Sequence, residues 1–360
     1  MKSSSARYLQ VSVFAAATVA VQLTAQVSGK AYFLTQLTMT AYATLVVVGL
    51  SLLMGYAGQI SLGHAGFFAL GGYTAAALTT WDLGPRRGQA IVAALARLHV
   101  LVLRPDPYGA DVLTVHPWAA FACAVALTAA VAFVIGIPVL KLTGHYLAMA
   151  TLGIGTILYS VALGTPSLGA ADGISGVPPF QLVPGLQIGG SPSIRVQNYY
   201  LAWALVALSM LLLLNLIHSR VGRALRAIHA AEDAASAMGI DTARFKLRTF
   251  VLSAALAAVA GVFSTHFNGG IGPSEASIMK SVKYLAIVAV GGMGSLWGSL
   301  TASAVLNFLS LRGYFGSFDD AVFGGILILV MLFSPDGILE LDLRAALRSL
   351  LRKPRPTGES

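Results

Sequence analysis

Long uncharged apolar runs separated by short polar connections dominate the chain. Eight runs contain no Asp, Glu, Lys or Arg, and they cover residues 34–54, 58–81, 117–140, 145–171, 198–217, 249–267, 284–311 and 321–335. A helix needs about 20 predominantly apolar residues to cross the hydrocarbon core of a bilayer. The runs are continuous rather than alternating, so they predict membrane-spanning helices and not the alternating strands of an outer-membrane barrel.

The composition supports a membrane location. Of the 360 residues, 56% are hydrophobic and 10% are charged, whereas about a quarter of the residues in an ordinary globular domain are charged. The net charge of +9 comes from basic residues clustered beside the apolar runs, where they set membrane orientation. No basic stripe is interleaved with aromatic residues, so nucleic acid is not an expected partner. We therefore predict an all-α polytopic membrane protein that contacts the lipid bilayer.

The basic segments predict the orientation of the chain in the membrane. Residues 219–248 carry six basic and three acidic side chains, and residues 341–360 form a second basic segment. By the positive-inside rule both are cytoplasmic, as is the N-terminus with Lys2 and Arg7. This predicts about ten crossings. The crossing at about residues 281–294 is short, so we expect it to be tilted or partly non-helical.

These assignments divide the chain into three parts. Residues 1–30 form an N-terminal span with a short outer loop, interpreted as an uncleaved span rather than a signal peptide. Residues 31–340 form the membrane domain, and residues 341–360 form a basic cytoplasmic tail. The membrane domain contains an outer insert at residues 84–116, an outer loop at residues 166–197 and a cytoplasmic loop at residues 219–246.

The outer insert contains an apolar core, AIVAALARLHVLVL. Arg97 at its centre would be costly in hydrocarbon, so we expect an amphipathic helix lying on the outer side. The alternative, in which the insert spans the membrane, would reverse the orientation of everything before it. The single Cys123 allows no intramolecular disulfide and no cysteine metal site.

Two glycine-rich stretches interrupt apolar runs in opposite halves of the chain. GQISLGHAGFFALGGY covers residues 58–73, and VGGMGSLWGS covers residues 290–299. Each glycine weakens a helix by roughly 1 kcal/mol relative to alanine. Matched interruptions in two pseudo-related halves are typical of discontinuous helices along a transport pathway, although small residues also form tight packing faces. The candidate pathway residues are Gln59, Ser61, His64, Phe67, Tyr73, Gly291, Gly292 and Gly294.

The cytoplasmic loop predicts a short helix over residues 223–238 with a small apolar face. The residues that follow the spacing of that face are Ala224, Ile228, Ala231, Ala235 and Met238. Gly239 supplies a left-handed stop, and Asp241 can cap the helix that continues into the next span. We expect this helix to protrude into the cytoplasm, with an amphipathic segment lying on the bilayer as the alternative.

Four separated motifs carry a family resemblance. They are GYAGQISLGHAGFFALGGYTAA, LGAADGISGVPP, RALRAIHAAEDAASAMGIDTARFK followed by FVLSAALAAVAG, and LAIVAVGGMGSLWGS. In this order, from about Leu34 to Pro335, the chain resembles the inner-membrane permease subunits of branched-chain amino acid ABC transporters, in particular the longer of the two permease types.

The resemblance implies that the cytoplasmic loop is the Glu-Ala-Ala-type coupling loop that docks into an ATPase subunit. Its residues here would be Arg226, Ile228, Glu232, Asp233, Ala234, Ala235, Met238 and Gly239. The chain departs from the family where His229 and Ala230 replace a usual Arg-Glu pair. The outer insert at residues 84–116 is also longer than the family pattern, and it is a candidate contact of the binding protein.

The resemblance also implies a bacterial inner-membrane location, partners and cargo. The partners are a homologous second permease, two cytoplasmic ABC ATPases and an extracytoplasmic binding protein that delivers a branched-chain or related small amino acid. Urea or a short amide is the alternative cargo. ATP and Mg²⁺ would bind to the ATPases, and this chain would hold no cofactor and no metal.

Two functions of other classes are less consistent with the sequence. The sequence contains no phosphate-binding Gly-x-x-x-x-Gly-Lys-Ser/Thr loop, no His-Glu-x-x-His motif and no Gly-x-Ser-x-Gly elbow, so we expect a transporter subunit and not an enzyme. An intramembrane enzyme would need ionisable or nucleophilic residues that converge at membrane depth. An ion-coupled secondary transporter can contain broken helices, but it has no use for a protruding docking helix.

Overall fold

A computed structural model describes residues 4–86, 100–105 and 111–333. Six of its helices are long and apolar enough to cross a membrane. These are α1 (Ser4–Val27), α2 (Phe33–Ala57), α5 (Pro117–Val139), α6 (His145–Gly164), α7 (Arg195–His218) and α10 (Thr242–Asn268). The apolar runs form helices because a backbone in hydrocarbon must satisfy its own hydrogen bonds.

Four shorter helices occupy the other predicted crossings: α3 (His64–Thr80), α11 (Ile278–Gly291), α12 (Leu296–Leu311) and α13 (Asp319–Phe333). They contain 14 to 17 residues, which corresponds to about 21 to 26 Å at 1.5 Å per residue. The hydrocarbon core is about 30 Å thick. The all-α polytopic fold is confirmed, whereas the count of ten crossings stays a prediction.

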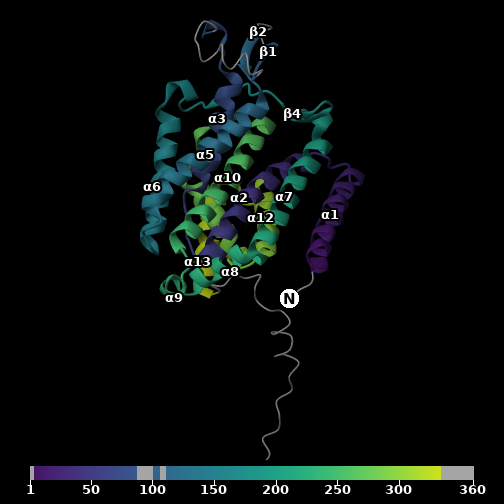
Figure 1. The fold of residues 1–360 in the computed structure, drawn as a ribbon. Helices are drawn as coiled ribbons and strands as arrows, with labels where there is room; N and C mark the ends of the chain where they lie inside the picture. The colour runs from purple at the N-terminus through teal and green to yellow at the C-terminus, as the bar shows by residue number, and fades with distance from the viewer. Residues whose placement is uncertain (1–3, 87–99, 106–110, 334–360) are drawn as a thin grey trace, which may run out of the picture.

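Helix α2 forms the centre of the bundle. In its hydrophobic window 83% of the residues are buried, against 28% in α5 and α6 and 11% in α1. It packs against α7, α10, α11 and α12, and the labels of α7, α10 and α12 lie beside it in Figure 1. The least buried helices lie at the periphery and present apolar side chains outward, as lipid-facing helices do.

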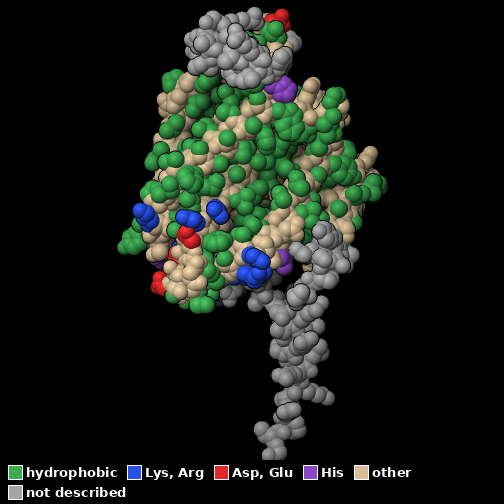
Figure 2. Space-filling view, viewed as in Figure 1, with side chains coloured by type: hydrophobic (Ala, Val, Ile, Leu, Met, Phe, Trp, Pro, Cys, Tyr) green, Lys and Arg blue, Asp and Glu red, His purple; other side chains and the backbone are tan. Residues whose placement is uncertain are grey.

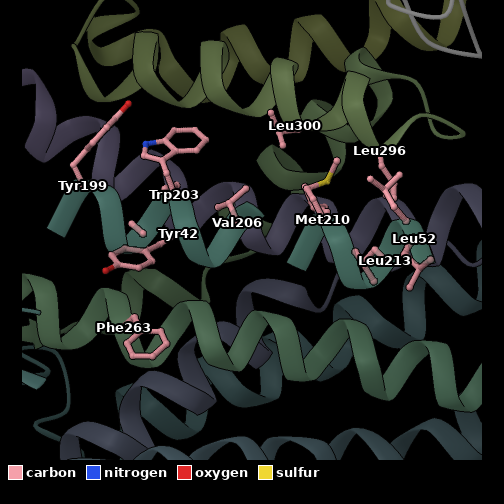
Figure 3. Packing of buried hydrophobic residues seen from close by; sticks show 14 of the residues in the cluster. Tyr42, Leu52, Tyr199, Trp203, Val206, Met210, Leu213, Phe263, Leu296 and Leu300 are labelled. Carbon is pink, nitrogen blue, oxygen red and sulfur yellow. The ribbon is translucent and has the colours of Figure 1, made fainter. Parts of the chain in front are cut away.

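The contact between α2, α7 and α12 is a continuous apolar cluster. Figure 3 shows side chains of α7 spaced three or four residues apart lying close to side chains of α2 and α12, and Phe263 of α10 lies nearby. The α7 members are Tyr199, Trp203, Val206, Met210 and Leu213. This spacing is that of one helical face, so α7 presents a single stripe to the core.

Short strands close the end of the bundle predicted to be outside. They are β1 (Leu101–Pro105), β2 (Asp111–Val115), β3 (Ile174–Ser175), β4 (Phe180–Val183), β5 (Leu186–Ile188) and β6 (Gly270–Ile271). The pairs β1–β2, β3–β6 and β4–β5 are antiparallel. The 3₁₀ turns are η1 (Gly84–Arg86), η2 (Pro166–Leu168), η3 (Pro192–Ile194), η4 (Pro273–Ala276) and η5 (Gly316–Phe318).

The predicted helix of the outer insert is wrong over its last residues. Leu101–Leu103 lie in strand β1, where Leu101 pairs with Val115 and Leu103 with Leu113. Their partners Leu113 and Val115 in β2 are buried, whereas Leu103 is 57% exposed. The rest of the predicted helix, residues 87–99, lies outside the described residues, as does the basic tail.

The two ends of the molecule differ in charge and structure. The β1–β2 hairpin lies at one end, and helices α8 (Arg220–Ala230) and α9 (Glu232–Ala237) lie at the other, near the N-terminus. Hydrophobic side chains cover the middle of the face in Figure 2, and Lys and Arg side chains gather towards the α8–α9 end. The β1–β2 hairpin and the α8–α9 pair are thus on opposite ends, in the arrangement that the charge pattern predicts.

Candidate coupling and translocation site

The first glycine-rich stretch is a real interruption between α2 and α3. Helix α2 ends at Ala57, and Gly58 adopts a left-handed conformation with φ of +66°. The chain then runs without helical structure to Gly63, and α3 begins at His64. A residue with a Cβ rarely adopts positive φ, so Gly58 sets the point at which α2 stops.

His64 fixes the start of α3 to α10. Its Nδ1 lies 3.0 Å from Ser61 Oγ, and its Nε2 lies 2.7 Å from Ser253 Oγ of α10. The rings of Phe67 and Phe250 pack edge-on against the imidazole. Both ring nitrogens have hydroxyl partners and the side chain is 1% exposed. The arrangement fits a positioning role for His64 rather than a proton relay.

Backbone groups of the interruption bind two further helices. Leu62 N donates to Thr151 Oγ1 of α6 at 3.0 Å, and Ala65 N donates to Ser281 Oγ of α11 at 3.3 Å. The first N–H groups of a helix have no partner within the helix, and a side chain of α11 satisfies that of Ala65 near the start of α3. Helices α6, α10 and α11 therefore converge on the start of α3.

Two predicted pathway side chains carry buried polar atoms without partners among the described residues. Gln59 is 2% exposed, and neither its amide nitrogen nor its oxygen has a hydrogen bond in that part of the chain. The hydroxyl of Tyr73 is in the same situation. A buried amide without partners costs about 1 to 3 kcal/mol. Water, cargo or another subunit would remove this cost, and the pathway role of both residues stays a prediction.

Several glycines of the first stretch serve close helix packing. A Cβ on Gly71 would lie 2.6 Å from Ala258 Cα, and one on Gly72 would lie 2.5 Å from Thr265 Oγ1. On the opposite helix, a Cβ on Gly261 would lie 2.0 Å from Phe68 O. The backbones of α3 and α10 thus touch, as small residues allow in membrane helices. Phe67 is fully buried in the same packing.

The second glycine-rich stretch forms the turn between α11 and α12. Helix α11 ends at Gly291, Gly292 adopts φ of +88°, and Ser295 caps α12 by accepting from Gly298 N at 3.0 Å. A Cβ on Gly298 would lie 1.9 Å from Gly291 O. Close backbone contact therefore requires glycine on both sides of this turn.

The end of α2, just before the first interruption, contacts the second interruption. The hydroxyl of Tyr56 in α2 donates to Gly294 O at 2.8 Å. A Cβ on Gly55 would lie 1.4 Å from Met293 O. The sequence singled out both stretches, but nothing in it indicated that the end of α2 lies against residues 292–295.

The predicted coupling helix is wrong as one continuous element. Ala231 adopts φ of −160° and ψ of 99°, which ends α8 and begins α9. Glu232 and Asp233 then occupy the first turn of α9, where acidic side chains are stabilised by the helix dipole. The break redirects the second half of the predicted face.

The residues of the predicted apolar face therefore differ in their burial. Ile228 and Ala235 are buried against the bundle, whereas Met238 is 84% exposed. Asp233 and Ala234 are exposed as well. The exposed surface of α9 and the residue after it therefore differs from the face that helical spacing predicted.

The predicted end of the coupling segment is confirmed. Gly239 adopts φ of +83°, and Asp241 caps α10 by accepting from Arg244 N at 3.1 Å. Glu232 forms an ion pair with Lys246, whose side chain is 9% exposed. This pair attaches α9 to the start of α10.

Two further contacts attach α8 to the bundle. Arg226 Nη2 donates to Ile217 O at 3.2 Å. His229 Nδ1 lies 2.9 Å from Gly55 O, and because a carbonyl only accepts, Nδ1 carries the proton. Sequence reasoning noted His229 as a departure from the family but found no signal for this contact.

Sequence reasoning also missed a cavity of about 320 Å³ at the predicted outer end. It lies between α3, α10, the β3–β6 pair and η4. Phe68, Asp172, Asn268 and Glu275 are among its lining residues. None of the candidate pathway residues lines it. Its polar lining residues include Asp172 and Ser175 from the LGAADGISGVPP motif and Ser264, Thr265 and Asn268 from α10.

Together these features define a polytopic helical membrane protein with two helix interruptions, the second of which contacts the end of α2, and with a helical pair at one end of the bundle. The comparisons with known sequences place it more closely. The family described as branched-chain amino acid transport system, permease component, matches residues 32–331. The chain belongs to this family.

Individual relatives agree with the family assignment. The high-affinity branched-chain amino acid transport system permease protein LivM of Salmonella typhimurium is 32% identical over 324 residues, covering 84% of this chain and 68% of the relative. LivH of Escherichia coli is 39% identical over 141 residues, covering 38% of this chain and 46% of the relative. No solved structure matches the chain.

Proposed function

We propose that this chain is one of two permease subunits of an ATP-driven importer. It would receive a branched-chain or related small amino acid from an extracytoplasmic binding protein and pass it through a pathway shared with a second, homologous permease. Two ATPases on separate chains would supply the energy and bind the ATP and Mg²⁺. Relatives named as two different permeases of one kind of transport system support the pairing.

The observation that carries the proposal is the helical pair α8–α9. It attaches to the bundle through Arg226, His229 and Glu232, while Asp233, Ala234 and Met238 are exposed. A firmly attached element with a small, exposed surface suits insertion into a groove of a partner. An ion-coupled transporter would have no use for it.

Co-purification tests the docking. Ala234→Trp places a bulky ring on the exposed surface of α9, and we expect the ATPases to be lost from the purified complex while the second permease is retained. Ala243→Trp is the matched control, since Ala243 is also exposed but lies in α10 beyond the coupling pair. Retention of the ATPases by Ala234→Trp, with undiminished uptake, would remove the docking role.

The cargo requires a separate measurement. The partner binding protein is titrated with branched-chain amino acids, other amino acids, short amides and urea, and the best ligand is then followed into vesicles that contain ATP. We expect a branched-chain or related small amino acid to bind most tightly and to accumulate. If urea or an amide binds most tightly, the proposal of an importer stands and the proposed cargo changes.

A further inference from the structure

The last turn of α2 lies between the coupling loop and the second helix interruption. We call residues 55–58 the α2 end turn. On one side His229 of α8 donates from Nδ1 to Gly55 O at 2.9 Å. The carbonyls of the last helical turn have no partner within the helix, and this bond satisfies one of them. A Cβ on Gly58 would lie 3.3 Å from His229 Cδ2, so the imidazole rests against Gly58.

On its other side the α2 end turn touches the connection between α11 and α12. A Cβ on Gly55 would lie 1.4 Å from Met293 O, so the two backbones are in direct contact. One residue further on, the Tyr56 hydroxyl donates to Gly294 O at 2.8 Å. Three neighbouring residues thus contact α8 on one side and residues 293–294 on the other.

The elements on both sides are themselves firmly attached. Gly222 of α8 packs so closely that a Cβ on it would lie 2.2 Å from Ile217 O of α7. Helices α2 and α12 are joined by hydrogen bonds from Ser299 Oγ to Ser51 Oγ at 3.0 Å and between Thr44 and Ser303 at 2.9 Å. Close-packed interiors transmit displacement rather than absorbing it. A movement of α8 must therefore move the α2 end turn or break these bonds.

We propose that the α2 end turn carries movement of the coupling loop to the α11–α12 turn, with His229 and Tyr56 as the positioning residues at its two contacts. The inference rests on the proposed function, because an ATPase has to supply the movement. It assigns roles to two side chains that the family resemblance does not identify. Tyr56 separates transmission from docking better than His229 does, since it lies inside the bundle and away from the exposed docking surface.

Tyr56→Phe tests the inner contact in the complete transporter reconstituted in vesicles. The variant keeps the ring and removes only the hydroxyl that reaches Gly294 O. We expect normal retention of the ATPases but a fall in uptake per ATP hydrolysed of about fivefold, the factor that corresponds to one ordinary hydrogen bond. Tyr42→Phe is the matched control in the same helix, because the Tyr42 hydroxyl is buried and has no partner among the described residues.

Variants of His229 test the other contact, and they provide a second test if Tyr56→Phe does not assemble. His229→Ala removes the donor to Gly55 O, whereas His229→Asn keeps an N–H near the position of Nδ1. We expect uptake per ATP to fall in the alanine variant and to recover in the asparagine variant. Wild-type uptake per ATP in both Tyr56→Phe and His229→Ala would overturn the inference. Loss of the ATPases from the wild-type complex would instead refute the proposed function.

Discussion

Gly261→Ala tests whether the membrane glycines act through helix packing. Gly261 lies in α10, where its added Cβ would be 2.0 Å from Phe68 O of α3 and 3.2 Å from Gly72 N. Real Cβ atoms essentially never approach another heavy atom closer than 3.0 Å. Phe68 O belongs to the backbone and cannot rotate away, so α3 and α10 must separate.

The magnitude of the effect follows from this separation. The helices have to move apart by about 1 Å, and a gap of this size forfeits a quarter to a half of the dispersion energy of each contact along the seam. Inserting a methyl group into a well-packed interior costs about 1 to 3 kcal/mol. Since backbone rather than a flexible side chain opposes the change, we expect a loss at the upper end, about 2 to 3 kcal/mol.

Thermal stability in detergent is the assay, followed as the fraction that stays monodisperse after heating. Gly153→Ala in α6 is the control, because a Cβ there would meet nothing within 4 Å. Alanine is a better helix former than glycine by up to about 1 kcal/mol, so the control should be unchanged or more stable. Equal stability of the two variants would contradict the packing argument and would reopen a pathway role for this face.

Three further predictions concern the cytoplasmic end and the orientation. Gly239→Val should weaken ATPase retention, because the left-handed conformation costs a residue with a Cβ about 1 to 2 kcal/mol. Asparagine tolerates that conformation, so Gly239→Asn should retain more of the ATPases than Gly239→Val. Glu232→Gln should lower the melting temperature by leaving the buried Lys246 ammonium unpaired, and adding Lys246→Met should recover much of the loss. A membrane-impermeant thiol reagent added outside intact cells should label Val183→Cys and not Met238→Cys, both exposed sites at opposite ends; the reverse pattern would invert the orientation.

The membrane helices could be predicted because lipid leaves a backbone few choices. The uncharged run at residues 117–140 became α5 within one residue at each end, and the run at 249–267 became the membrane part of α10, which begins seven residues earlier at Thr242. Gly239 and Asp241 were also predictable, since positive φ and helix capping are local properties of single residues. The family resemblance added the role of the coupling loop, which no local rule supplies.

Long-range contacts explain most of what the sequence could not predict. Nothing near Ala231 marks a helix break, because alanine is the best helix former, and the break follows from how α8 and α9 pack on the bundle. The bonds of Tyr56 to Gly294 and of His229 to Gly55 join residues 238 and 174 positions apart. Periodicity places residues on faces, but it does not say which face of another helix they meet.

The central position of α2 has a consequence for biosynthesis. Its hydroxyls at Thr44 and Ser51 find their partners on Ser303 and Ser299, which follow 259 and 248 positions later in the chain. Ribosomes add about 5 to 20 residues per second, so α2 spends roughly 12 to 50 s in the membrane before those partners exist. During that interval α2 lacks these interhelical contacts, and within the helix Thr44 Oγ1 can donate only to Thr40 O. Assembly of this protein is therefore exposed to misfolding and proteolysis early, well before its last spans leave the ribosome.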